Sequence, residues 1–292
     1  MKIIECCPFF KENLIAEIHI KESAKWVDEI HITECDMTHQ YREKAFYFEH
    51  ENLDKVRYHK LPAKKLFLKP RKFIPHIKLT NKPAWHPKVF KNGSWYNEGM
   101  QRSKILPDFK DNDILVLSDI DEIIDAKFAP AILAEVEKRG IVTVKFHFTL
   151  FYFNLFSKKW GGPADYSYRT FIVKGKVFRE QWNSDYSTLR RLGERFELVD
   201  KVYCMPNIVG FHHSWLGDEK FISEKLAAYT HVEHAKYNDP EYIKNSLAQG
   251  VSIFPDQELE INNTIHLLDQ IEQNRERYKA LFIVPKPKDQ NL

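Results

Sequence analysis

Hydrophobic and polar residues alternate in two different ways over the first 35 residues. Residues 2–7 form a short apolar run, residues 12–24 carry apolar side chains at helical spacing, and residues 27–35 alternate as a strand does. Strand, helix and strand in so short a stretch are typical of a βαβ unit. The sequence therefore predicts two neighbouring parallel strands at the N-terminus.

The segment DILVLSDIDEIID, residues 113–125, has the strongest pattern in the chain. Residues 114–117 are all apolar, as in a strand that is buried on both faces. Four carboxylates follow: Asp119, Asp121, Glu122 and Asp125. Open α/β sheets bind ligands beyond the carboxyl ends of their strands, so this strand is expected to bring acidic groups to such an edge.

Asp119 and Asp121 are separated by one residue, so their side chains point the same way in an extended segment. Two like charges this close repel each other unless a cation lies between them. Mg²⁺ and Mn²⁺ accept carboxylate oxygens and keep positions open for water and phosphates. The pattern thus indicates a site for a metal and a diphosphate; its alternative is a solvated acidic turn. Aspartyl-phosphate hydrolases also place such a pair after a strand, but Ile123 does not fit their pattern.

The rest of the chain predicts an α/β protein with a central mixed sheet flanked by helices. Helices are expected at 95–106, 128–138, 241–248 and 261–282 and from 217 onward, and strands at 141–156, 169–177 and 208–211. Residues 38–87 are irregular and basic, and residues 179–198 are polar. We expect a main domain over 1–235 and a helical extension over 236–292 that packs on it.

Three more residues are expected near the acidic turn. Glu34 ends the strand at 27–35 and is either an acceptor for a nucleoside or a loop carboxylate in water. Arg102 lies on the helix that precedes the buried strand and can reach the same crevice if the two pack together. His212 follows the strand at 208–211 and can be a metal ligand or a donor to a diphosphate.

Composition narrows the class of protein. Lys and Arg number 44 against 41 Asp and Glu, which does not suggest nucleic-acid binding. The four cysteines show no metal-binding spacing and are expected to be reduced, buried thiols. The opening residues do not resemble a signal peptide, and no apolar run approaches the ~18 residues of a membrane span. These features predict a soluble cytoplasmic protein.

Five segments in order resemble glycosyltransferase family 17, the family of the bisecting β-1,4-mannosyl-glycoprotein N-acetylglucosaminyltransferases. They are CCPFFKENLIAEI, VDEIHITECDMT, NEGMQRSKI with DNDILVLSDIDEI, FYFNLFSKKWGGP, and GFHHSWLGDEKFISEKLAAYTHVE. The chain departs from the family pattern at Leu14, Phe211 and His213. Vertebrate members carry a membrane anchor that is not seen here, which suggests a bacterial or viral relative with a different acceptor.

The resemblance implies a GT-A fold and an inverting, metal-dependent transfer of a sugar from a UDP-sugar, first of all UDP-GlcNAc, to a glycan hydroxyl. It implies Mn²⁺ or Mg²⁺ held by Asp119, Asp121 and His212. The donor would be bound by Glu34, Arg102, Asp119 and Lys225. The candidates for the catalytic base are Asp165, Glu180, Asp185 and Glu122. A metal-dependent phosphohydrolase and a non-catalytic carbohydrate-binding protein remain as alternatives.

Overall fold

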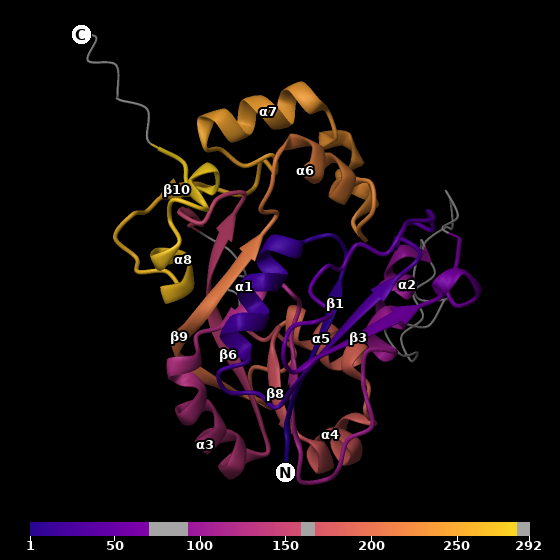
Figure 1. The fold of residues 1–292 in the computed structure, drawn as a ribbon. Coiled ribbons are helices and arrows are strands. Elements are labelled where there is room, and N and C mark those ends of the chain that lie inside the picture. Colours follow the sequence, from indigo (N-terminus) through magenta and orange to yellow (C-terminus); the bar gives the residue numbers. More distant parts are fainter. Residues whose placement is uncertain (70–92, 159–166, 285–292) are drawn as a thin grey trace.

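The computed structural model describes residues 1–69, 93–158 and 167–284, which fold into a sheet with helices on both faces (Figure 1). The strands are β1 (Ile3–Phe9), β2 (Glu29–Cys35), β3 (Val56–Leu61), β4 (Ile114–Leu117), β5 (Glu122–Ile124), β6 (Ile141–Leu150), β7 (Leu155–Ser157), β8 (Phe171–Lys174), β9 (Tyr203–Ser214) and β10 (Leu259–Ile261). The α-helices are α1 (Asn13–Ser23), α2 (Gly93–Ser103), α3 (Ala129–Arg139), α4 (Gly175–Trp182), α5 (Tyr186–Glu194), α6 (Glu219–Leu226), α7 (Pro240–Gln249) and α8 (Asp269–Gln273).

The sheet is mixed. Its order is β10-β7-β6-β8-β4-β1-β2-β3, and β9 pairs with both β6 and β5. The pairs β4–β1, β1–β2 and β2–β3 are parallel, whereas β8 runs antiparallel to both β4 and β6. This arrangement confirms the predicted α/β class with a central mixed sheet, and β1, α1 and β2 form the predicted βαβ unit.

Strand β4 is buried on both faces, as its apolar run predicts. Ile114 and Val116 belong to one hydrophobic core, which includes residues of α3. Leu115 and Leu117 belong to a second core, which includes residues of α4 and α5. Because successive side chains of a strand point to opposite faces, this alternation places β4 between two helical layers. The turn that follows β4 is therefore anchored by a rigid element.

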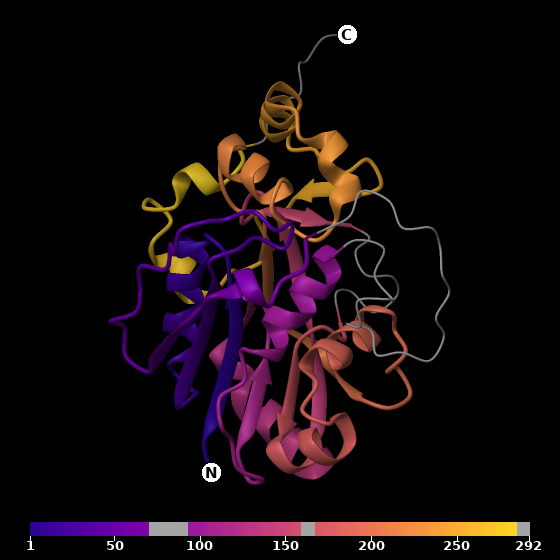
Figure 2. The same cartoon turned by 90° about the vertical axis from the view of Figure 1, so that its right-hand side faces the viewer.

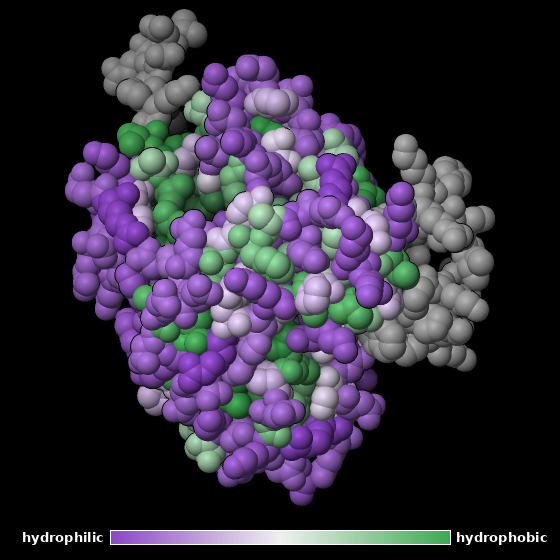
Figure 3. Space-filling model, turned by 45° about the vertical axis from the view of Figure 1, so that its right-hand side comes forward, coloured by the Kyte–Doolittle hydropathy of each residue, from purple (hydrophilic) through white to green (hydrophobic). Residues whose placement is uncertain are grey.

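Two pairs of helices lie at opposite ends of the molecule. In Figures 1 and 2, α6 and α7 lie at the end toward which β6 and β9 run, and α3 and α4 lie at the opposite end. Strand β10 pairs with β7 and so joins the residues after 235 to the same sheet; the predicted division at 235 stays a prediction. On the face drawn in Figure 3, hydrophilic residues predominate and hydrophobic ones form small patches.

Several predicted elements differ in extent from the observed ones. The long strand expected at 141–156 divides into β6 and β7, because Phe151 has a positive φ of 66° that ends the extended run. The helix expected at 261–282 is wrong in its extent. The chain forms β10 and the short α8 there, and the Asn262 side chain accepts hydrogen bonds from the backbone of Thr264 and Ile265, which favours a turn.

Two regions that were not assigned elements contain them. Strand β3 is an edge strand with several exposed polar residues, so its alternation is hidden. The polar stretch 179–198 holds part of α4 and α5, and the buried residues of α5 include the polar Ser187 and Arg190, which hide its apolar pattern. Cys6, Cys7 and Cys35 are free and buried, as expected, and Cys204 is free and half-buried. Within the described ranges, no helix has both the length and the apolar character to cross a membrane.

Candidate functional site

The turn between β4 and β5 lies in a cleft at the carboxyl edge of the parallel strands. The cleft has a volume of about 550 Å³. It is lined by residues that follow β1, β2 and β4, by α2 and α5, by the end of β9, and by α6 with the segment after it. Asp119, Asp121, Arg102, His212 and Lys225 all line this cleft, so the structure brings these five predicted residues together.

Asp119 is held by two arginines. Its oxygens Oδ1 and Oδ2 lie 3.0 and 2.9 Å from Nη2 of Arg102, and Oδ2 is 2.9 Å from Nη2 of Arg190. Burial alone would raise the pKa of Asp119, but the two guanidinium groups outweigh burial and lower it. Asp119 is therefore a carboxylate whose oxygens are directed to cations of the chain.

Asp121 has a different set of partners. Its Oδ1 is 3.3 Å from Nε2 of His212, and its Oδ2 is 3.8 Å from Nζ of Lys225. Burial opposes ionisation, but His212 and Lys225 lower the pKa of Asp121 well below its ordinary range. Burial also acts against the charged form of Lys225, yet Glu12, 2.9 Å away, and Asp121 raise its pKa. Both groups are thus charged at neutral pH.

Glu122 lies behind the cleft. Its side chain is fully buried, accepts hydrogen bonds from Nη1 and Nη2 of Arg190 at 2.8 and 2.7 Å, and accepts another from Oγ1 of Thr170 at 2.6 Å. A base must reach the proton that it removes. In this structure Glu122 instead anchors Arg190, which in turn holds Asp119.

These contacts join into one ion-pair network. Its eleven members, all in the described part of the chain, are Glu12, Glu98, Arg102, Asp119, Asp121, Glu122, Arg169, Arg190, Glu194, His212 and Lys225. Six are carboxylates and four are Lys or Arg, so the carboxylates exceed the permanent cations by two. Buried charge of this kind is costly unless it is balanced. Among the described members, the excess of carboxylates favours an added divalent cation.

Arg190 and Glu98 are central to the network but were not predicted. Arg190 is 3% exposed in its side chain and bonds Asp119, Glu122 and Glu194. Glu98 lines the cleft, accepts from Nη1 of Arg102 at 2.6 Å and accepts from Oγ1 of Thr230 at 3.1 Å. The available sequence signal was the i,i+4 spacing of Glu98 with Arg102 and of Arg190 with Glu194.

Glu34 does not reach the cleft in this structure. Its buried carboxylate accepts hydrogen bonds from the Lys44 ammonium group, from the backbone N–H groups of Tyr47 and Phe48, and from the Tyr58 hydroxyl. These donors engage both oxygens, whereas the neighbouring Cys35 and Lys44 line the cleft. Glu34 thus fixes the segment after β2. Because its oxygens are engaged by these donors, this structure does not place them for the predicted contact with a nucleoside.

The remaining candidates for the base lie elsewhere. Asp185 caps the N-terminus of α5, where it accepts from the backbone N–H and the hydroxyl of Thr188 at 2.9 and 2.7 Å. Glu180 lies on α4 with its side chain 64% exposed. Neither is among the described residues that line the cleft. Asp165 lies outside the described residues.

Aromatic side chains and imidazoles also line the cleft. Phe9 and Phe10 come from the end of β1, Trp95 from α2, and Tyr229 and His231 from the segment after α6. The ring of His231 meets that of Trp95 edge to face at a centroid distance of 4.7 Å. Flat apolar faces next to charged groups suit both bases and sugar rings.

The donors partly fit a divalent cation. Ligands about 2.1 Å from one octahedral ion are about 3 Å apart, and Asp121 Oδ1 and His212 Nε2 are separated by 3.3 Å. The carboxylate excess of the network favours such an ion as well. However, Asp119 is turned toward its arginines. Within the described residues, the groups of three closely spaced potential ligands lie elsewhere, at Glu5, Cys7 and His19 and at His231, Glu233 and His234.

No family model and no curated protein matches the sequence. Solved structures that resemble the fold include S. aureus TarS 1–349 (TM-score 0.34, 8% identity, 87% of this chain and 70% of that one) and the same protein in complex with UDP (0.35, 10%, 97% and 83%). Another is the galactosyltransferase LgtC in complex with donor and acceptor sugar analogues (0.31, 12%, 98% of each chain). At these TM-scores the likeness carries no functional argument.

Proposed function

We propose that this chain is an inverting glycosyltransferase of the GT-A type, related to family 17, that moves a sugar from a UDP-sugar to a glycan hydroxyl. One observation carries the proposal: the pair Asp119 and Asp121 ends a buried parallel strand inside a cleft, surrounded by arginine, lysine and histidine. UDP-GlcNAc is the first candidate donor because of the family resemblance.

The cations of the cleft suit a diphosphate. Arg102, Arg190 and Lys225 line the cleft and are held by carboxylates of the network. Arginine can bond a phosphate with two N–H groups, and preorganised donors stabilise the charge that develops on a leaving diphosphate. We assign Arg102 and Lys225 to the diphosphate of the donor. Arg190, whose guanidinium is bonded to Asp119, Glu122 and Glu194, supports Asp119 from behind.

Asp121 and His212, with Asp119, would hold Mn²⁺ or Mg²⁺. When bound, such an ion supplies Lewis-acid stabilisation of the leaving diphosphate. The protein's own part is to keep Asp121 ionised through His212 and Lys225. It also keeps Asp119 at the edge of the cleft through Arg102 and Arg190.

We nominate Glu98 as the base that takes the proton of the acceptor hydroxyl. Burial would raise the pKa of Glu98, but Arg102 outweighs it and lowers the pKa, so the carboxylate is ionised. One oxygen is paired with Arg102, and the other accepts from the neutral hydroxyl of Thr230, its one partner among the described residues. Of the other described cleft carboxylates outside the aspartate pair, Glu12 engages both oxygens, with Lys225 and with the backbone N–H groups of Phe10 and Lys11, and Glu194 is bonded by two arginines. The Glu98 oxygen that accepts from Thr230 can therefore accept from the hydroxyl of a glycan acceptor instead.

The proposal is tested by thermal unfolding with UDP, GDP and CMP sugars, each with Mn²⁺ or with EDTA. A ligand that binds only the native state raises the midpoint of thermal unfolding. At one hundred times its Kd it adds about 2.7 kcal/mol to the free energy of unfolding. We expect a rise with a UDP-sugar that needs Mn²⁺. No response to any nucleotide would contradict the proposal and favour a carbohydrate-binding protein, and steady phosphate release from simple esters would favour a phosphohydrolase.

A further inference from the structure

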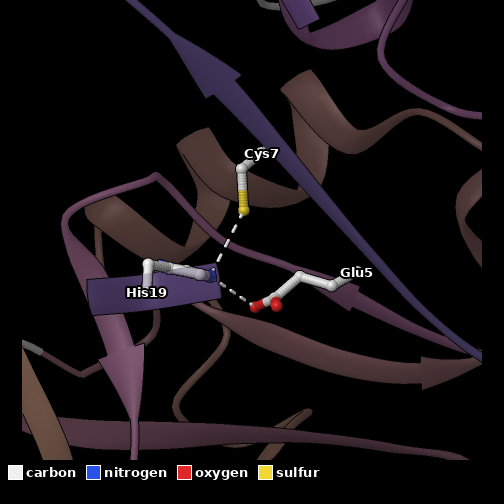
Figure 4. A group of neighbouring side chains, drawn as sticks. All are labelled: Glu5, Cys7 and His19. Atoms are coloured by element: carbon white, nitrogen blue, oxygen red, sulfur yellow. Dashed lines mark hydrogen bonds and ion pairs between the residues drawn. The ribbon is translucent and has the colours of Figure 1, made fainter. Parts of the chain in front are cut away.

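A second group of polar residues lies beneath the acidic turn, on the side away from the cleft. Glu5 and Cys7 project from β1 and His19 projects from α1, and the three side chains point toward one another (Figure 4). Each of the three residues is at most 2% exposed. Such a group is stable only if its polar atoms satisfy one another.

Both ring nitrogens of His19 face acceptors. Nδ1 is 3.0 Å from the carbonyl oxygen of Ile120, and Nε2 is 3.0 Å from Oε1 of Glu5. A carbonyl oxygen can only accept, so Nδ1 carries a hydrogen. The contact between Nε2 and the carboxylate then needs a second proton, because two lone pairs would otherwise face each other.

The charges around His19 favour placing that proton on the ring. Burial lowers the pKa of His19, but Glu5 outweighs it, and the Ile120 carbonyl and Asp121 add to the rise. Cys7 lies 3.7 Å from Nε2, and burial raises the pKa of its thiol far above the ordinary value, so it adds no charge. An imidazolium paired with one carboxylate makes the group neutral overall.

The group holds the acidic turn on both sides of Asp119. Ser118 lies 3.2 Å from Oε1 of Glu5 and 3.1 Å from Sγ of Cys7 through its hydroxyl. The carbonyl group of Ile120 accepts a hydrogen bond from Nδ1 of His19. Since Asp119 stands between these two residues and Asp121 follows them, the direction of both aspartates depends on this group.

We propose that His19 is a positioning residue: held as an imidazolium by Glu5, it bonds the carbonyl group of Ile120 and fixes the turn that presents Asp119 and Asp121 to the cleft. The role of the turn in binding a nucleotide rests on the proposed function, whereas the protonation of His19 does not. The competing explanation is a metal ion bound by Glu5, Cys7 and His19, which are close enough together to ligate one. A metal would need the Cys7 thiolate and would replace the proton on Nε2.

The first experiment is ¹⁵N NMR of histidine-labelled protein, with metal analysis of the same sample. We expect His19 to keep two protonated ring nitrogens at neutral pH, where an ordinary imidazole has lost one, no equivalent of bound metal, and a neutral ring in Glu5→Gln. A wild-type His19 with one unprotonated nitrogen at neutral pH would overturn the proposal, as would one equivalent of zinc. Both of these contradicting outcomes are measured on the wild-type protein without a nucleotide. Failure of the proposed function would therefore not affect the result.

Positioning is measured by amide hydrogen exchange at residues 119–121 and by UDP affinity in Mn²⁺. In Glu5→Gln we expect faster exchange in the turn and UDP binding weaker by about 10-fold, the scale of a lost supporting contact. His266→Gln is the control, because His266 also pairs with a carboxylate, Asp269 at 3.0 Å, but is 65% exposed. Unchanged exchange in a folded Glu5→Gln protein would contradict the positioning role even if UDP does not bind.

Discussion

The two faces of the acidic turn use the same chemical groups for different purposes. On the cleft face, His212 lies next to Asp121 in a network that has more carboxylates than permanent cations among its described members and that lines the cleft. On the buried face, His19 lies next to Glu5 in a small group of matched charge that is closed to solvent. The comparison teaches that two features matter more than residue type: whether a ligand can reach the pair, and whether its charges are balanced. They decide whether a histidine–carboxylate pair can bind a ligand or keeps its contacts within the protein.

The largest effect is expected on the cleft face. Asp121→Asn removes a charge that should face the ligand, so we expect UDP affinity in Mn²⁺ to fall about 100-fold or more. Because the fold holds the pKa of Asp121 low, we also expect the free energy of unfolding to fall at neutral pH. Calorimetry measures both quantities. Asp125→Asn is the matched control, since Asp125 belongs to the same segment but caps the short helix that follows and pairs with Lys127. Unchanged UDP affinity in Asp121→Asn would remove the distinction between the two faces.

Glu98→Gln keeps the shape of the side chain but removes its basicity. We expect the rate of sugar transfer to fall by about 10²–10⁴-fold, the usual contribution of a general base, while UDP affinity stays within about 3-fold. Initial rates of product formation at saturating donor provide the measurement. Glu135→Gln removes the carboxylate of a similar i,i+4 pair with Arg139, on α3, and should leave the rate unchanged. Full activity in Glu98→Gln would transfer the role to another carboxylate.

Arg190→Met tests whether the network is needed for folding as well as for binding. It leaves the buried Glu122 without its main cation, which should cost about 3–5 kcal/mol in the free energy of unfolding. Urea denaturation measures the loss. Arg179→Met breaks an exposed pair with Asp111 and should cost about 1 kcal/mol or less. If both variants lose the same amount, the buried charge of Glu122 does not depend on Arg190.

The smallest effect concerns pH and the buried face. The pKa of His19 is raised in the folded protein, so its contribution is complete below the unfolded value of about 6.5 and is lost as pH rises through the folded value. Each unit of difference corresponds to about 1.4 kcal/mol. We expect the stability of the wild type to fall toward alkaline pH and that of Glu5→Gln to fall less. Midpoints of thermal unfolding from about pH 6 to about pH 10 provide the test, and parallel curves would count against a charged His19.

The sequence predicted the part of the site that depends on local pattern. A four-residue apolar run defines β4, and carboxylates directly after it must lie at the end of that strand, so Asp119 and Asp121 could be located before the structure. The same logic located His212, which follows the apolar part of β9. These residues are close in sequence to the element that positions them.

The partners of these residues could not be predicted in the same way. Arg190 reaches Asp119 only because α5 packs beside α2, and nothing in residues 179–198 indicates that packing. Glu34 ends β2 as expected, but the segment that covers it contributes Lys44, Tyr47 and Phe48, whose course is irregular. The role of a polar residue depends on what faces it, and those contacts are tertiary.

The pairing of β5 with β9 has a consequence for how the protein is made. Glu122 is in register with His212, and the backbones are so close that a Cβ on Gly210 would collide with the carbonyl oxygen of Ile123. The cleft therefore cannot be completed until residues well beyond 210 have left the ribosome. A nascent chain that has reached only α3 would expose its acidic turn without His212 or Lys225. Under the proposed function, donor binding would report that synthesis has passed α6.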